Sequence, residues 1–255
     1  MTAEVRIVAD AESLARAGAS AFVEVAKQAV RANGVFTVAL SGGSTPKALY
    51  SLLASDASFK SQVPWDKTHF FWGDERHVPP DHADSNYRMT NDTMLAKAPV
   101  PAGNVHRIKG ELEDARQAAE DYERALRDFF KLAPGQLPRF DLVLLGMGPD
   151  GHTASLFPGT KALSEQQHLV AANWVEKFDS YRITLTLPVL NNAACVVFLV
   201  SGAEKAETLC AVLSGEAGSE PYPSQLIHPT RGRLIWLVSS DAARLLPKQR
   251  SGAAQ

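Results

Sequence analysis

Hydrophobic positions along the chain alternate between helical spacing and strand spacing. Apolar residues recur at every third or fourth position over 10–33, which predicts an amphipathic helix that Asp10 caps and Gly34 ends. Further helices are predicted over 46–54, 86–95, 111–132 and 203–213. Apolar runs typical of buried strands lie at 35–40, 68–72, 140–145, 181–187, 195–200 and 233–238. This alternation predicts an α/β fold with a mostly parallel sheet and helices on both of its faces.

The chain contains no repeat, low-complexity tract or linker-like segment that would divide it into parts. With 45% hydrophobic residues it has enough apolar material for a sizeable core. We therefore expect a single domain over residues 1–255.

Charge and apolar content argue against several classes of partner. A net charge of -2 without local runs of like charge does not suggest binding to nucleic acid or to a membrane. No apolar segment approaches the length of about 18 residues that spans a bilayer. The first residues lack the pattern of a secretion signal, so we expect a cytoplasmic protein. Cys195 and Cys210 are then predicted to be reduced thiols.

Three loops that follow predicted strands have an unusual composition, and the first covers 41–46. It combines glycines with hydroxyl residues ahead of Pro46, which suits the first position of a helix and makes Thr45 the predicted N-cap. Free backbone N–H groups and the helix dipole at such a position favour an anion. The loop lacks the spacing of a P-loop. A tight strand–helix turn without a ligand is the simpler interpretation, since such turns are common in α/β folds.

The second loop lies between 74 and 86 and collects acids, histidines and an arginine. Arg76 is suited to binding a phosphate or a carboxylate. His82 and Asp84 extend the group toward a metal cluster, but no pair has a recognised zinc spacing on a regular element. A solvated surface loop is the remaining interpretation.

The third loop, 146–158, carries Asp150 and His152 after a fully apolar run. Open α/β sheets bind ligands at the carboxyl ends of their strands, so this titratable pair is suited to acid–base chemistry with His152 as a general base. The glycines also match the dinucleotide fingerprint G-x-G-x-x-G, but Pro149 and Pro158 exclude the long helix that this fingerprint requires. A purely structural histidine is the alternative for His152.

Six short segments, taken together, carry a resemblance to a known family. They are SGGSTP at 41–46, GDER at 73–76, SNY at 85–87, GMGPDGHTASLFP at 146–158, RITLT at 182–186 and SGAEK at 201–205. These segments resemble those of the 6-phosphogluconolactonase family, in the expected order and over about residues 10–240. The resemblance implies a Rossmann-like α/β fold shared with glucosamine-6-phosphate isomerases. It also implies hydrolysis of 6-phosphoglucono-1,5-lactone in the pentose phosphate pathway, without a metal or a cofactor.

The resemblance further implies roles for particular residues. His152 is the expected general base that activates water, and Asp150 is expected to orient it. The other implied residues bind the substrate: Gly43, Ser44, Thr45, Arg182 and Lys205 at the phosphate, and Asp74, Arg76 and Asn86 at the sugar. The expected partner is a small sugar-phosphate lactone, and a monomer is expected. The chain departs from the family pattern at Asp179 and Ser180, where prolines are expected.

Two other functions are compatible with the same fold. An aldose–ketose isomerase needs an additional carboxylate after the histidine, as in D-G-H-x-A-F-N-E, but Phe157 stands at that position. A sugar-phosphate sensor needs a DNA-binding module, and the segment before the first predicted strand holds one helix, which is too little for a helix-turn-helix.

Because a lactone carbonyl is already electrophilic, one neutral imidazole and a few N–H donors suffice for its hydrolysis.

Overall fold

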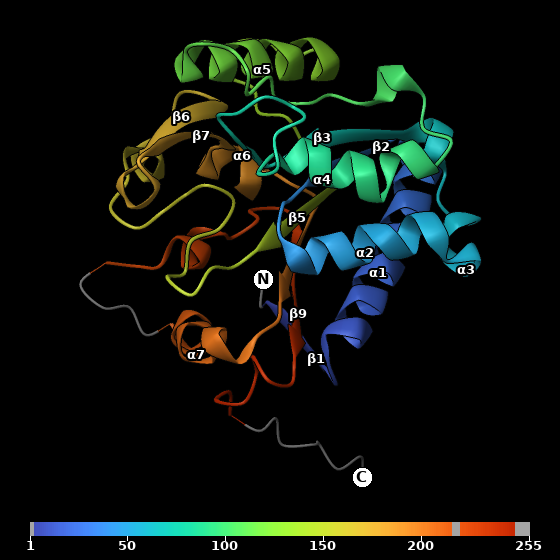
Figure 1. The fold of residues 1–255 in the computed structure, drawn as a ribbon, viewed down its shortest axis with the longest axis vertical. Helices are drawn as coiled ribbons and strands as arrows, with labels where there is room; N and C mark the ends of the chain where they lie inside the picture. Colours follow the sequence, from blue (N-terminus) through green and yellow to red (C-terminus); the bar gives the residue numbers. More distant parts are fainter. Residues whose placement is uncertain (1–2, 216–219, 248–255) are drawn as a thin grey trace.

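A central sheet of six parallel strands organises the molecule, and the computed structural model describes residues 3–215 and 220–247 of it. The strands lie in the order β1-β9-β8-β5-β2-β3 (Figure 1). Their bounds are Glu4–Val8 for β1, Phe36–Leu40 for β2, Thr68–Trp72 for β3, Leu142–Gly146 for β5, Cys195–Val200 for β8 and Arg233–Ser239 for β9. The predicted parallel α/β sheet is thereby confirmed.

Helices cover both sides of these strands. Figure 1 shows α1 and α2 on one side and α7 on the other. The helices are α1 (Ala11–Asn33), α2 (Ser44–Ser55), α3 (Ala57–Lys60), α4 (Asn86–Thr93), α5 (Ala115–Phe130), α6 (Leu187–Asn191) and α7 (Ala206–Ser214). None of the helices in the described part of the chain combines the length and the apolar character needed to cross a bilayer.

The ends of the long N-terminal helix follow the sequence signals. The Asp10 side chain accepts a hydrogen bond from the backbone N–H of Ser13, and Gly34 ends α1 in the left-handed conformation. The prediction of Thr45 as an N-cap is wrong, because α2 begins at Ser44 with Gly43 at the cap. Asp114 caps α5, which therefore begins later than the predicted helix at 111.

A second, smaller sheet was not predicted. It is antiparallel, with the order β4-β7-β6, and its strands are β4 (Asp74–Arg76), β6 (Val170–Val175) and β7 (Ser180–Leu185). The expectation that 181–187 belongs to the parallel sheet is wrong, because the four residues between β6 and β7 permit a hairpin and not a parallel crossover. The short polar strand β4 has no hydrophobic run that would reveal it.

The first strand of the chain was also missed. β1 precedes α1 and pairs with β9 at the edge of the main sheet. Its residues are mostly exposed or half-buried, so it lacks the apolar run of an interior strand. In contrast, every residue of β2 and of β8 is buried. Elements from α1 to β9 share one hydrophobic cluster, and the single domain over 1–255 stays a prediction.

The parallel arrangement brings several loops to one edge of the sheet. Strands β2, β5 and β8 run in the same direction, so the loops that follow them all leave at their carboxyl ends. These loops are 41–43, 147–158 and 201–205. The edge where they meet is the position at which open α/β sheets bind their ligands.

Candidate active site

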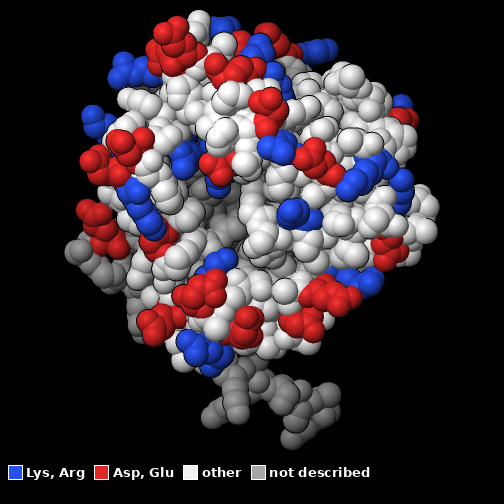
Figure 2. Space-filling model, in the orientation of Figure 1, with Lys and Arg blue, Asp and Glu red and all other residues white. Residues whose placement is uncertain are grey.

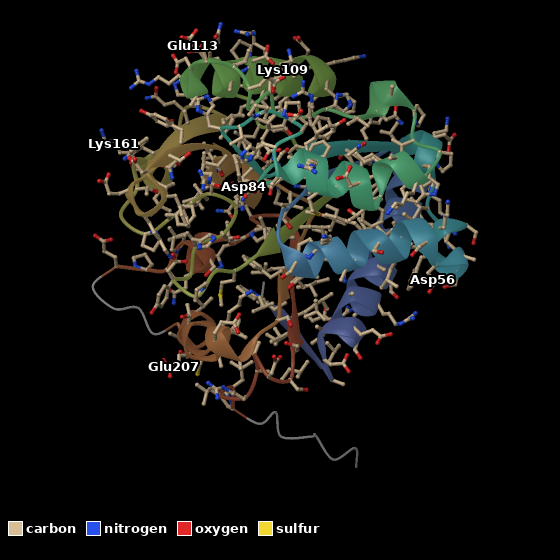
Figure 3. The ribbon with its side chains drawn as sticks, in the orientation of Figure 1. Asp56, Asp84, Lys109, Glu113, Lys161 and Glu207 are labelled. Carbon is tan, nitrogen blue, oxygen red and sulfur yellow. The ribbon has the colours of Figure 1, made fainter. Side chains whose placement is uncertain are left out.

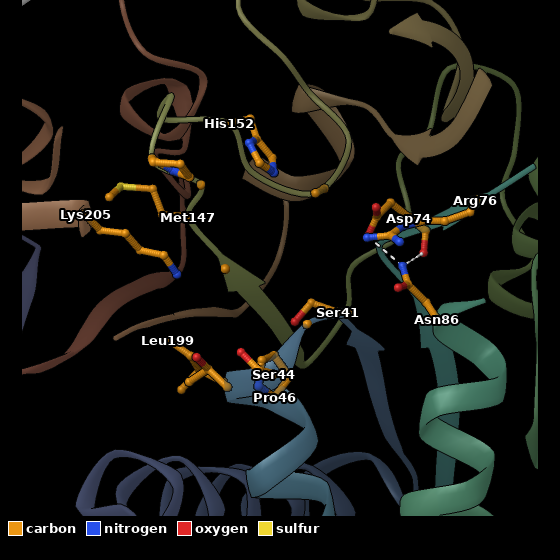
Figure 4. A pocket seen from close by; sticks show the side chains of 17 residues that line it. Ser41, Ser44, Pro46, Asp74, Arg76, Asn86, Met147, His152, Leu199 and Lys205 are labelled. Carbon is orange, nitrogen blue, oxygen red and sulfur yellow. Dashed lines mark hydrogen bonds between the residues drawn. The ribbon is translucent and has the colours of Figure 1, made fainter. Parts of the chain in front are cut away.

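A cavity of about 240 Å³ lies at this edge of the sheet. Figure 2 shows the molecular surface hollowed there, with Lys and Arg side chains near the rim, and Figure 4 shows the cavity from close by. It is lined by Ser41, Gly42, Gly43, Ser44, Thr45, Pro46, Asp74, Arg76, Asn86, Gly146, Met147, Gly148, Pro149, His152, Ala154, Leu199 and Lys205. All three loops singled out in the sequence therefore contribute to one cavity.

The beginning of α2 forms one wall of the cavity. Gly43 occupies the cap position with a φ of 104°, which favours glycine, and no side chain caps the helix. The backbone N–H groups of the first turn are therefore available, and the helix dipole adds a partial positive charge there. Gly42 is needed for a different reason, since a Cβ at this position would overlap the Asn86 side chain.

His152 is held in place on several sides. Its ring stacks on Phe157 at a centroid distance of 4.2 Å, and its Nδ1 hydrogen-bonds to Oδ1 of Asp150. The loop itself is closed by a hydrogen bond from the N–H of Gly148 to the carbonyl of His152. The His152 side chain keeps 27% of its surface exposed, so it is anchored and still accessible from the cavity.

The Asp150 carboxylate also contacts a lysine. Lys177, in the turn between β6 and β7, lies 3.2 Å from Oδ2 of Asp150. Partial burial alone would raise the pKa of Asp150, but the hydrogen bond and charge of His152 and the hydrogen bond from Lys177 hold it well below its usual range. Asp150 is therefore an anion at neutral pH, and it makes Nδ1 the protonated nitrogen of a neutral His152. The lone pair then lies on Nε2, which has no hydrogen-bond partner among the described residues.

The side chains of the three charged residues of β4 point alternately to opposite sides of the strand. Asp74 and Arg76 line the cavity, whereas Glu75 between them is turned toward α4. Oδ2 of Asp74 accepts a hydrogen bond of 2.6 Å from the Ser155 hydroxyl, and the Asn86 amide donates to the carbonyl of Asp74. This segment was predicted to be a loop. As a strand it points only alternate residues at the cavity.

Glu75 has a structural position at the start of α4. It accepts hydrogen bonds from the backbone N–H groups of Asn86, at 2.7 Å, and Tyr87, at 2.8 Å. Burial raises the pKa of Glu75, and these N–H donors oppose that shift. Glu75 thereby fixes the position from which Asn86 reaches the cavity.

The two cations expected at the phosphate are placed differently. Lys205 precedes α7 and lines the cavity, and its burial lowers its pKa. Arg182 lies opposite Arg76 across the β4–β7 pair and outside the cavity lining. Its guanidinium lies 5.1 Å from the centroid of the Phe178 ring, and burial followed by the charge of Arg76 lowers the pKa of Arg182.

Most of the residues singled out in the sequence meet at the cavity. Asp150 and Arg182 do not line it, and Asp150 acts on it through its hydrogen bond to His152. The sequence analysis missed Lys177, which no sequence signal connects to Asp150, and Ser155. Within residues 3–215 and 220–247, no group of three or more His, Cys, Asp or Glu side chains is placed to hold a metal ion.

A family model described as "Glucosamine-6-phosphate isomerases/6-phosphogluconolactonase" matches residues 9–236, nearly the whole chain. The chain belongs to this family. A 6-phosphogluconolactonase of Nostoc sp. is 45% identical over 214 residues, which cover 84% of this chain and 86% of that relative.

Solved structures agree with this family membership. The crystal structure of the devB protein aligns with a TM-score of 0.87 at 35% identity, covering 96% of this chain and all of that one. The 6-phosphogluconolactonase from Trypanosoma cruzi aligns with a TM-score of 0.84 at 30% identity, covering 96% and 98% of the two chains. The six segments that carried the resemblance therefore belong to a match that extends over the whole fold.

Proposed function

We propose that this chain hydrolyses 6-phosphoglucono-1,5-lactone to 6-phosphogluconate as a step of the pentose phosphate pathway. The observation that carries the proposal is the arrangement within one cavity. His152, oriented by an ionised Asp150, shares it with the uncapped start of α2 and with Lys205. A base and an anion-binding end in one cavity suit a phosphorylated substrate that water attacks. The 45% identical relative from Nostoc sp. has this activity in its name.

The first chemical step uses Nε2, the ring nitrogen of His152 that does not contact Asp150. Nε2 accepts a proton from a water molecule while the water oxygen bonds to the lactone carbonyl carbon, which gives a tetrahedral oxyanion. The imidazolium formed in this step is stabilised by the Asp150 carboxylate at Nδ1. When the intermediate collapses, the ring C–O bond breaks, and the imidazolium returns its proton to the departing hydroxyl oxygen. Water and the lactone are the reactants, and the carboxylic acid that forms releases its proton to the solvent.

The rest of the cavity binds and positions the substrate. We assign the phosphate to the first turn of α2, with Gly43, Ser44 and Thr45, together with Lys205. Asp74, Arg76 and Asn86 are assigned to the sugar hydroxyls. Arg182 is also assigned to the phosphate, and it lies beside Arg76, outside the cavity lining.

The isomerase alternative is less well supported at one position. Phe157 stands where an isomerase of this fold is expected to carry an additional acid, and its ring is packed against His152. The deciding experiment is a pH-stat assay with freshly prepared 6-phosphogluconolactone, with glucosamine 6-phosphate as the control substrate. We expect acid release above the spontaneous rate from the lactone alone. Conversion of glucosamine 6-phosphate without lactone hydrolysis would reject the proposal.

Replacing Lys205 with alanine is expected to weaken binding of the phosphorylated lactone by about 1.5–3 kcal/mol, as for a hydrogen bond to a charged group. Turnover of unphosphorylated gluconolactone should barely change. Lys161→Ala is the matched control, because Lys161 is exposed at the periphery of the molecule (Figure 3). Steady-state kinetics on both lactones measures the effect. Equal losses on the two substrates would place Lys205 in a structural role.

The proposed mechanism needs no metal, so exhaustive treatment with a chelator is expected to leave lactonase activity unchanged. The activity should be measured before and after removal of the chelator and after addition of single divalent ions. Activity that is lost with the chelator and restored by one of these ions would contradict the metal-free mechanism.

Three further properties belong to the proposal. We infer that the chain acts as a single domain over residues 1–255, as a monomer, and in the cytoplasm. The shared hydrophobic cluster supports the single domain. Light scattering on the purified protein tests the monomer.

A further inference from the structure

The turn between β6 and β7 packs against the loop that carries His152. The turn covers Glu176–Phe178, and two of its side chains, Lys177 and Phe178, contact that loop. Lys177 contacts Asp150, and Phe178 contacts Phe157. Since Asp150 and Phe157 both hold the imidazole ring in place, the turn is connected to the ring through two neighbours.

Lys177 contacts the Asp150 carboxylate at the oxygen that His152 does not use. Its Nζ lies 3.2 Å from Oδ2, whereas the ring Nδ1 and the backbone N–H of His152 both contact Oδ1. Without Lys177 the described contacts of the carboxylate are all at Oδ1. The torsion that turns an aspartate carboxylate has broad energy minima, so contacts at both oxygens restrict it more than contacts at one. Lys177 therefore fixes the direction from which Oδ1 faces the imidazole.

Phe178 supports the imidazole from another direction. Its ring packs edge-to-face on Phe157 at a centroid distance of 5.7 Å, and Phe157 in turn stacks on His152. The Lys177 ammonium lies 5.6 Å from the centroid of the Phe178 ring, within the range of a cation–π contact. This second contact keeps the ammonium near Asp150, although 59% of the Lys177 side chain is exposed.

Lys177 lies outside the cavity that is assigned to the substrate. It lines a separate cavity of about 780 Å³ together with Asp150 and Phe157, whereas His152 lines the substrate cavity. Asp150 contacts both Lys177 and His152, so it is the link between them. An effect of Lys177 on the reaction must therefore pass through Asp150.

We propose that Lys177 is a positioning residue, which holds the Asp150 carboxylate in the orientation that fixes His152 for proton transfer. This inference rests on the proposed function, because it takes His152 to be the general base. Ion pairs between exposed side chains add little to stability, so a loss of turnover in a Lys177 variant is separable from a loss of folded protein.

The test compares the steady-state kinetics of 6-phosphogluconolactone hydrolysis by wild type, Lys177→Met and Lys177→Arg. We expect kcat of Lys177→Met to fall about 10-fold per folded molecule, since misplacement of a catalytic group lowers turnover. KM should change by less than about 2-fold, because an interaction needed only in the transition state affects kcat. Lys177→Arg should keep most of the turnover, since a guanidinium also donates hydrogen bonds to a carboxylate.

Lys109→Met is the matched control for Lys177→Met. Lys109 forms an ion pair of nearly the same length with Asp121, at 3.1 Å, and its side chain is exposed to a similar degree, 49% (Figure 3). The two acids are equally exposed, at 28% each. Lys109 lines neither of the two cavities, so its removal should leave kcat and KM unchanged.

A double-mutant cycle tests whether Lys177 acts through Asp150. If it does, Lys177→Met should lower kcat of the wild type but cause little further loss in Asp150→Asn, because the group that it positions is already altered. Effects that multiply in the double variant would show that Lys177 acts independently of Asp150, and they would overturn the proposal.

Other results would also overturn it. Unchanged kcat in Lys177→Met would do so, as would equal losses in Lys177→Met and Lys109→Met. A higher KM with normal kcat would make Lys177 a substrate-binding residue instead. Failure of both Lys177 variants to fold would make its role structural. A wild type that does not hydrolyse the lactone rejects the proposed function and this inference together, whereas an active wild type with an equally active Lys177→Met rejects the inference alone.

Discussion

Replacing His152 with glutamine is expected to lower turnover of 6-phosphogluconolactone by roughly 10²–10⁴-fold, the range typical of one general base. Glutamine keeps a polar side chain next to Asp150 but cannot take a proton from water. The fold should persist, because His152 lies in a loop at the cavity and keeps about a quarter of its side chain exposed (27%). Turnover per folded molecule, with the folded fraction measured by thermal denaturation, gives the effect.

The pH dependence provides a second readout for the same residue. Since the pKa of Asp150 is held below its usual range, its charge does not change near neutral pH, and it cannot cause a change of rate there. A wild-type rate that falls as the pH is lowered below neutral is therefore not caused by Asp150. His152→Gln should lose this dependence, whereas the control His228→Gln, at an exposed histidine outside the cavity, should keep it. A stable His152→Gln protein with near-normal turnover would end the general-base assignment.

The ionised state of Asp150 also has a consequence for stability. Its pKa is lower in the folded protein than in the unfolded chain, so the folded state gives up this proton at a lower pH. The stabilisation is therefore complete above the ordinary aspartate range, near pH 4, and is lost as the pH falls through the lower folded value. Neutral assay conditions thus leave the Asp150–His152 contact intact.

Replacing Gly148 with alanine is expected to reduce turnover by about 10²-fold, because small misplacements of a catalytic group have effects of this size. A Cβ at 148 would come within 3.0 Å of the His152 ring and lie 2.7 Å from Oδ1 of Asp150. The ring is already stacked on Phe157 on another side, so it must leave its present position to avoid the overlap. Substrate affinity should change less than turnover, since the phosphate end of the cavity is not disturbed.

Gly103→Ala is the matched control for Gly148→Ala. A Cβ at 103 meets no atom within 4 Å, and the backbone there does not require glycine. Its kinetics should equal those of the wild type. If Gly148→Ala folds and retains normal turnover, the close packing around His152 is not needed for catalysis.

The parts of the fold that could be predicted are those with a local physical signal. α1 was predicted closely because its apolar face repeats along the helix and because Asp10 and Gly34 mark its ends. β4 could not be predicted, since three polar residues carry no periodicity that distinguishes a strand from a loop. β1 was missed for a related reason, as an exposed edge strand lacks the apolar run of an interior strand.

In the candidate site, too, only the contacts between residues close in sequence could be predicted. Asp150 and His152 lie two positions apart in one loop, so their pairing follows from local geometry and was predicted from the sequence. The contact between Lys177 and Asp150 joins residues 27 positions apart, and the one between Ser155 and Asp74 spans 81 positions. These contacts depend on how the small antiparallel sheet packs against the parallel one.

The sequence by itself therefore determined the α/β class, the loops that carry chemistry and the acid–histidine pair, because each rests on interactions within a few residues. The tertiary structure decided which side chains share the cavity. It placed Lys205 at the cavity and Arg182 beside Arg76 in the small sheet, and it left the Ser41 hydroxyl without a hydrogen-bond partner among the described residues. Strand register and sheet packing set these distances, and both depend on contacts between segments that are far apart in the chain.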